Sequence, residues 1–108
     1  MNTDADVLNF IKQCIKTRNI YWTYHINMRL RERFISRELI LNAIDSYEII
    51  EEYPEDKYLP SYLIYAKSGN VIFHIHFAID RLHDNIRMVT AYKPSFDKWE
   101  IGLKIRRK

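Results

Sequence analysis

The spacing of apolar residues changes once along this chain, close to Glu48, and that change limits the folds the chain can form. Before Glu48, apolar side chains recur every three or four residues, which is typical of amphipathic helices. After it, β-branched and aromatic residues alternate with other residues, which is typical of strands. A helical half followed by a strand half predicts an α+β fold, with the helices packed on one face of an antiparallel sheet.

Three helices are expected in the first half. The first begins near Thr3, which fits the start of a capping box, and ends near Arg18. The second covers about residues 24–33. Ser36 is the expected N-cap of the third helix, whose apolar stripe continues to Tyr47.

Four runs of strand-forming residues predict a four-stranded antiparallel sheet, and they cover residues 49–53, 62–66, 71–79 and 86–92. Residues 67–70 read Lys-Ser-Gly-Asn, a tight-turn signal, and residues 81–85 have hairpin length, so the strands should form a meander. In the third strand, Phe73, Ile75 and Phe77 share the face that the helices must cover. His74 and His76 share the other face, which the helices leave open.

Length and composition favour one domain over residues 1–108. With 108 residues and 47% hydrophobic content, the chain can bury one core, divided into a helical part (3–47), a sheet (48–93) and a closing loop with a basic tail (94–108). Cys14 is the single cysteine, which excludes an intrachain disulfide framework and favours the cytoplasm. We interpret Cys14 as a small core hydrophobe. The apolar runs are short, so no membrane span is expected.

The charges are unevenly placed along a chain whose formal net charge is +3. Residues 48–56 are acidic, whereas residues 104–108 and a stretch of arginines are basic; these arginines are Arg29, Arg31, Arg33 and Arg37. A modest basic excess permits an anionic partner such as RNA without requiring one.

A row of His25, Arg29 and Arg33 repeats every four residues, so a helix places one imidazole beside two guanidiniums. Such a row suits a phosphate, because an anion relieves the repulsion between the two cations. The alternative is a structural ion-pair network. Its carboxylates would come from Glu32, Glu38 or residues 48–56.

His74 and His76 can change charge near neutral pH, as a general acid or base must, although strand histidines also serve structural roles. A His-x-His pair without a third ligand does not predict a metal site. Thr90 and Tyr92 share a face of the last strand, where they can hydrogen-bond a phosphate or stack on a base, or act simply as good strand formers.

The order of these polar residues along the chain resembles that of the bacterial "domain of unknown function 4258" family. The resemblance begins at Thr23-x-His25 and the following arginines, continues through Glu51-Glu52-Tyr53-Pro54, Asp56 and Pro60-Ser61, and ends with His74, Ala78, Asp80, Thr90-Ala91-Tyr92, Pro94 and Trp99. One departure is Phe34, where the family usually has glycine.

This resemblance implies an α+β fold grouped with toxin ribonucleases that include RelE and barnase. It also implies an antitoxin encoded beside the toxin, a small zinc-finger protein of the YgiT type. The family's polar positions fall on residues already noted here: His25, Arg29, Arg33, His74, Thr90 and Tyr92.

The leading hypothesis is therefore a cytoplasmic toxin of a type II toxin–antitoxin system, which cleaves mRNA without metal or another cofactor, either free or on the ribosome. The ribose 2′-OH would attack the adjacent phosphate, with His25 or His74 as base and the other as acid. Arg29 and Arg33 would stabilise the phosphate charge. The remaining expected site residues are Tyr92, Thr90, Arg31 and His76. The alternative is a non-catalytic module that binds RNA or a protein through the same basic and aromatic face.

Overall fold

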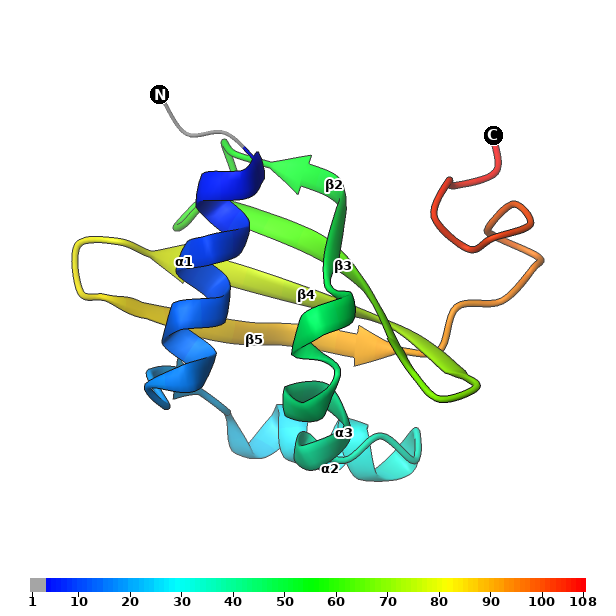
Figure 1. The fold of residues 1–108 in the computed structure, drawn as a ribbon, viewed down its shortest axis with the longest axis horizontal. Helices are drawn as coiled ribbons and strands as arrows, with labels where there is room; N and C mark the ends of the chain where they lie inside the picture. Colours follow the sequence, from blue (N-terminus) through cyan, green and yellow to red (C-terminus); the bar gives the residue numbers. More distant parts are fainter. Residues whose placement is uncertain (1–3) are drawn as a thin grey trace.

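The computed structural model describes residues 4–108, which form an α+β fold (Figure 1). The first half contains α1 (Asp4–Lys16), β1 (Ile20–Tyr21), α2 (Tyr24–Glu32), α3 (Arg37–Asn42) and the 3-10 helix η1 (Ile44–Ser46). The second half contains β2 (Glu48–Tyr53), β3 (Ser61–Ser68), β4 (Val71–Asp80) and β5 (Asn85–Tyr92). The expected change from helix to strand near Glu48 is confirmed.

The sheet has five strands in the order β1-β5-β4-β3-β2. The antiparallel meander from β2 to β5 is as predicted. The prediction of a four-stranded, purely antiparallel sheet is wrong. A fifth strand, β1, pairs in parallel with β5 through Ile20 and Ile86. Because β1 has two residues, it is too short to show the alternation on which strand prediction depends.

The helix boundaries follow local capping chemistry. The Thr3 cap lies outside the described residues, and α1 ends before the expected Arg18, whose φ of 64° is not helical. Ser36 is confirmed as the N-cap of α3, since its hydroxyl accepts a hydrogen bond from the Leu39 amide at 2.9 Å. The predicted third helix is split, because α3 ends at Asn42 and η1 carries the stripe toward Tyr47.

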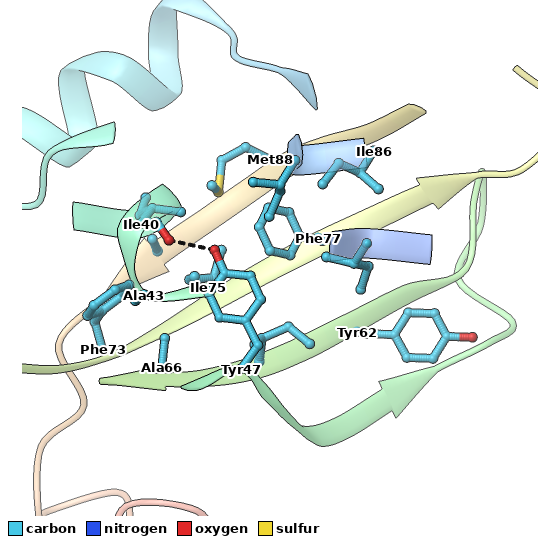
Figure 2. Packing of buried hydrophobic residues seen from close by; sticks show 14 of the residues in the cluster. Ile40, Ala43, Tyr47, Tyr62, Ala66, Phe73, Ile75, Phe77, Ile86 and Met88 are labelled. Carbon is cyan, nitrogen blue, oxygen red and sulfur yellow. Dashed lines mark hydrogen bonds between the residues drawn. The ribbon is translucent and has the colours of Figure 1, made fainter. Parts of the chain in front are cut away.

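The main core lies between the helices and one face of the sheet, where Phe73, Ile75 and Phe77 are fully buried (Figure 2). Figure 1 shows α1 lying across the strands on this face. The buried Tyr47 hydroxyl donates to the Ile40 carbonyl at 2.6 Å, which satisfies the polar end of this ring.

The opposite face was expected to stay open, and this is only partly true. Residues 94–108, here called the C-terminal cover, place Trp99 and Leu103 against Leu63 of β3 and form a second small core. The basic end of the cover is held to the acidic β2 strand, since Lys104 pairs with Glu48 at 3.1 Å. The segment expected as a closing loop with a basic tail therefore packs on the sheet.

In residues 4–108, no helix has the length and apolar character needed to cross a membrane.

Candidate functional site

A cleft of about 690 Å³ lies between the sheet and the C-terminal cover, and we call it the sheet cleft. Its walls come from β2 to β5, the β2–β3 loop, the C-terminal cover and the residue after α2. The lining residues are Arg33, Glu51, Tyr53, Asp56, Leu63, His76, Thr90, Tyr92, Lys93, Pro94, Ser95, Lys98, Trp99 and Arg106. Segments distant in sequence thus place cations, carboxylates, an imidazole and hydroxyls around one hollow.

A bulge in β5 directs two of these side chains into the cleft. His76 pairs with Thr90 and the next residue, Phe77, pairs with Met88, so Val89 is left without a partner. Strict alternation would place Met88 and Thr90 on the same face. The extra residue instead leaves Met88 in the main core and turns Thr90 to the cleft, with Tyr92 beside it.

A second bulge does the same in β2. Ile49 pairs with Ile64 and Glu51 with Leu63, which leaves Ile50 unpaired. Ile49 packs on the main core, whereas Ile50 packs beneath the C-terminal cover and Glu51 lines the cleft. In both strands, therefore, the alternation of side chains between the two faces of the sheet is reversed next to the site.

His76 is the histidine that lines the cleft. The Ser61 hydroxyl donates to the Asp56 carboxylate, which can only accept, so its oxygen accepts from His76 Nε2 at 2.8 Å. This order leaves the proton on Nε2 and a lone pair on Nδ1. Partial burial lowers the pKa of His76 below its usual 6.5, so the imidazole is neutral at neutral pH.

His74 lies two residues earlier on the same face but is fully buried. Its Nε2 donates to the Leu103 carbonyl at 2.7 Å, and its Nδ1 accepts from the Tyr92 hydroxyl at 3.2 Å. The ring edge meets Trp99, with centroids 4.4 Å apart, and burial lowers the pKa of His74. His74 therefore anchors Tyr92 and the C-terminal cover from beneath the cleft.

Arg33 reaches the cleft from the end of α2. One guanidinium nitrogen donates to the Thr90 hydroxyl at 3.0 Å and to the Ala91 carbonyl at 2.8 Å. These bonds use a single nitrogen of the guanidinium, so the remaining donors can meet an anion in the cleft.

Glu51, Arg106 and Tyr53 form a charged cluster across the cleft. Arg106 donates to both Glu51 carboxylate oxygens, at 3.0 and 2.9 Å, and the Tyr53 hydroxyl also donates to this carboxylate. The Arg106 hydrogen bonds lower the pKa of Glu51, while the hydrogen bond to Glu51 raises the pKa of Tyr53. Glu51 is thus ionised and neutralised within the cleft.

The remaining charges make the cleft basic. After Glu51 and Arg106 are paired, the other lining cations are Arg33, Lys93 and Lys98, and the other lining anion is Asp56. This excess of positive charge favours an anionic ligand.

The predicted site residues do not all meet in the cleft. Arg33, His76, Thr90 and Tyr92 line it, and His74 lies beneath it. His25, Arg29 and Arg31 are exposed on α2 and are not lining residues of this cleft. Within residues 4–108, none of the three arginines of α2 and its C-cap is in an ion pair, so the alternative of a structural network with residues 48–56 is not supported.

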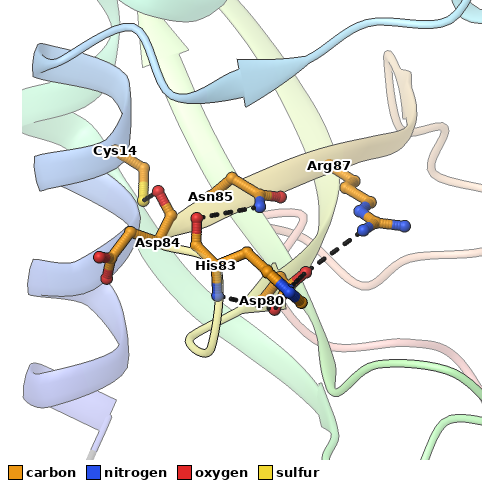
Figure 3. Close-up of polar contacts among 6 residues, drawn as sticks. All are labelled: Cys14, Asp80, His83, Asp84, Asn85 and Arg87. Atoms are coloured by element: carbon orange, nitrogen blue, oxygen red, sulfur yellow. Dashed lines mark hydrogen bonds and ion pairs between the residues drawn. The ribbon is translucent and has the colours of Figure 1, made fainter.

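His83 lies in the β4–β5 turn, and Cys14 lies on α1 beside this turn (Figure 3). His83 Nδ1 contacts Asp80 at 2.9 Å, and Arg87 contacts the same carboxylate at 3.2 Å. Cys14 is buried, and burial raises the pKa of its thiol, as suits a small core residue. No group of three or more potential metal ligands gathers in the part of the chain that the structure describes.

Several cleft residues were not predicted as site residues, namely Glu51, Tyr53, Asp56, Lys98, Trp99 and Arg106. Four of these residues belong to the motifs that carry the family resemblance, and those motifs were the sequence signal that could have identified them as site residues. They are Glu51, Tyr53, Asp56 and Trp99. Lys98 and Arg106 have no comparable signal, because only the folding of the C-terminal cover brings them to the sheet.

Comparison with known proteins gives one match. Among curated proteins and among solved structures, none matches the chain significantly. One family model, described as "Domain of unknown function (DUF4258)", matches residues 22–93, which include α2, α3 and strands β2 to β5. Because this match covers more than half of the 108 residues, the chain belongs to the DUF4258 family.

Proposed function

We propose that this chain is a metal-independent endoribonuclease and that the sheet cleft is its active site. The observation that carries the proposal is the neutral His76 imidazole, which Ser61 holds and whose Nδ1 has no hydrogen bond among residues 4–108, in a cleft with an excess of cations. A base near neutral pH and cations for a phosphate are the groups that cleavage by a ribose 2′-OH needs.

In this mechanism His76 Nδ1 removes the 2′-OH proton, and the alkoxide attacks the adjacent phosphorus. Arg33 and Lys98 stabilise the additional charge on the phosphorane. The 5′-oxygen leaves with a proton from a cleft hydroxyl, and the raised pKa values of Tyr53 and Tyr92 keep both protonated at neutral pH. The products are a 2′,3′-cyclic phosphate and a free 5′-hydroxyl. The acid–base pair proposed from sequence, His25 with His74, is replaced by His76 and a tyrosine, because His74 is enclosed and His25 lies outside the cleft.

We further propose the biological role that the family resemblance implies. The fold is grouped with the toxin ribonucleases RelE and barnase, and the chain acts as the toxin of a type II toxin–antitoxin pair in the cytoplasm. Its neutralising partner is a small zinc-finger protein of the YgiT type. Growth arrest on expression, relieved by co-expression of that partner, is the expected behaviour.

The decisive experiment incubates purified protein with cellular RNA in EDTA and examines fragment ends for 2′,3′-cyclic phosphate. His76→Ala should slow cleavage by about 100-fold or more, the usual effect of losing a general base. His83→Ala is the matched control, since His83 is an exposed histidine outside the cleft, and it should cut at the wild-type rate.

If wild type leaves RNA intact both alone and with translating ribosomes, the catalytic proposal fails and a binding module remains. Such a module would bind RNA with an affinity that falls steeply as salt rises. If His76→Ala cuts at the wild-type rate, the assignment of the base is wrong.

A further inference from the structure

A second concave surface lies between α2 and α3, on residues that the sheet cleft does not use. This groove has a volume of about 810 Å³, and we call it the α2–α3 groove. Its floor is aliphatic, formed by Leu30, Ile35 and Leu39, and Met28 lies beside it. Tyr24 and Phe34 line it and are 81% and 85% exposed.

Phe34 occupies a backbone position that favours glycine. The Phe34 amide donates to the Arg31 carbonyl and the Ile35 amide to the Leu30 carbonyl, the pair of bonds that closes a helix in a Schellman motif. This motif gives Phe34 a φ of 57°, a left-handed conformation that is unfavourable for a bulky residue. The ring is 85% exposed and gains little burial in exchange, so packing within residues 4–108 does not account for an aromatic ring at this position, and the ring is accessible to a partner.

The polar edge of the groove is basic. Arg31 and Arg37 line it, and none of its lining residues within 4–108 is an aspartate or glutamate. Within the described chain neither arginine is in an ion pair, and Arg37 is held by the Asn27 side chain at 3.0 Å and by the Trp22 ring. The groove thus combines an apolar floor with unneutralised positive charge.

We propose that the α2–α3 groove binds an acidic amphipathic helix of a partner protein. An apolar groove between two helices accepts the aliphatic row of a third helix, with Phe34 and Tyr24 as anchors, while carboxylates flanking that row meet Arg31 and Arg37. An aliphatic floor fits leucine-like side chains better than nucleobases, which bind by stacking on flat rings. This inference does not depend on the activity of the sheet cleft.

The test uses fluorescence anisotropy with a labelled helical peptide of about 16 residues, long enough for four helical turns. The peptide carries leucine at every third or fourth position and glutamate on both sides, and its twin carries lysine in place of glutamate. We expect the acidic peptide to bind at least about tenfold tighter than the lysine twin, since like charges facing Arg31 and Arg37 repel.

Phe34→Gly is the informative variant, because glycine relieves the strained φ and the protein should stay folded. It should weaken binding of the acidic peptide by about 30-fold or more, as for a central aromatic hot spot. Leu82→Gly, at an equally exposed apolar residue in the β4–β5 turn, should bind like wild type. Arg31→Glu should reduce or reverse the preference for the acidic peptide.

Three results would overturn the proposal. The first is no binding of the acidic peptide, or binding that Phe34→Gly leaves unchanged. The second is Phe34-dependent binding of a single-stranded RNA of about 12 nucleotides without peptide binding, which would make the groove an RNA contact. The third is a dimer in light scattering that Phe34→Gly abolishes, which would mean that a second copy of the chain fills the groove.

Discussion

Two histidines on the same face of β4 have different roles because their surroundings differ. His74 has both ring nitrogens hydrogen bonded and Trp99 against its edge, so it holds the C-terminal cover and Tyr92 in place. His76 has one nitrogen held by Ser61 and borders the cleft. The same residue type therefore serves packing at one position and, as we propose, chemistry at the next.

The pH dependence of cleavage should follow His76. The base must be neutral, and burial lowers the pKa of His76 below 6.5. We therefore expect kcat/KM to stay high at neutral pH and to fall on acidification with a midpoint below pH 6.5. Measuring kcat/KM from about pH 4.5 to 8 tests this, since the free enzyme's essential base sets that limb. A midpoint above 6.5, or a profile unchanged in His76→Gln, would contradict the assignment.

The Ser61 hydroxyl should matter through His76. Ser61→Ala removes the acceptor that holds His76 Nε2 and the link to Asp56. We expect a loss in kcat larger than any change in KM, because the imidazole is no longer oriented. Ser61→Thr, which keeps the hydroxyl, is the matched variant and should retain more activity than Ser61→Ala. Equal kcat in the three proteins would remove Ser61 from the positioning of His76.

Among the structural elements, the C-terminal cover is packed on the sheet and forms one side of the cleft. Trp99 is 2% exposed and forms an isolated bridge with Arg106, whose guanidinium stacks over the indole at 4.6 Å. Arg106 also holds Glu51 of β2. The cover therefore joins the second core to one wall of the cleft.

Trp99→Ala should destabilise the protein by about 3 to 5 kcal/mol, the usual cost of removing a large buried aromatic side chain. It should also expose His74 and move its pKa up toward 6.5, because burial is what lowers it. Urea unfolding and NMR titration of the histidines measure the two effects. Phe96→Ala, at a ring 61% exposed on the same segment, should change stability by less than about 0.5 kcal/mol. If Trp99→Ala lowers the free energy of unfolding no more than Phe96→Ala does, the C-terminal cover contributes little to folding.

The N-cap of α3 offers a smaller test of the same kind. Ser36→Ala removes the acceptor for the Leu39 amide and should lower the free energy of unfolding by about 1 kcal/mol. Ser36→Asp keeps an acceptor at the cap and should unfold close to the wild-type midpoint. If the alanine and aspartate variants have equal stability, the cap contributes nothing.

In the whole molecule, one sheet separates two layers that differ in their packing. The helices bury the main core on one face, and the C-terminal cover and the cleft occupy the other. The second face therefore holds the buried His74, the half-buried His76 and charged groups, whose titration makes folding depend on pH.

Stability should decrease as pH falls below about 6.5. The folded-state pKa values of His74 and His76 are both lowered, so between those values and 6.5 the unfolded chain binds more protons. The free energy of unfolding then decreases with acidification in that window, and Glu51 adds a further decrease at lower pH, since its folded pKa is also lowered. Urea denaturation at a series of pH values measures the slope. His74→Gln keeps a donor for Leu103 and should have a shallower slope; a rise in stability on acidification would contradict the reasoning.

Local pattern alone determined much of this fold. The change of period near Glu48, the Ser36 cap and the turn at Gly69, whose φ is 59°, all depend on neighbouring residues, and all were predictable. The family match also contains many of the polar residues of the cleft, among them Arg33, Glu51 and His76, whereas Lys98 and Arg106 lie outside the matched region. Periodicity therefore predicted the helical half and four of the five strands, and the motif predicted part of the cleft lining.

Only the tertiary structure decided which face each residue takes and which residues meet. The bulges at Ile50 and Val89 move the side chains of Glu51 and Thr90 to the other face of the sheet. The amino-acid composition of a strand does not reveal where such a one-residue shift occurs. The pairing of Glu51 with Arg106 joins residues 55 positions apart, which no local pattern specifies. Sequence spacing reports the backbone around each residue, whereas burial, hydrogen-bond partners and pKa depend on chain segments that come together only on folding.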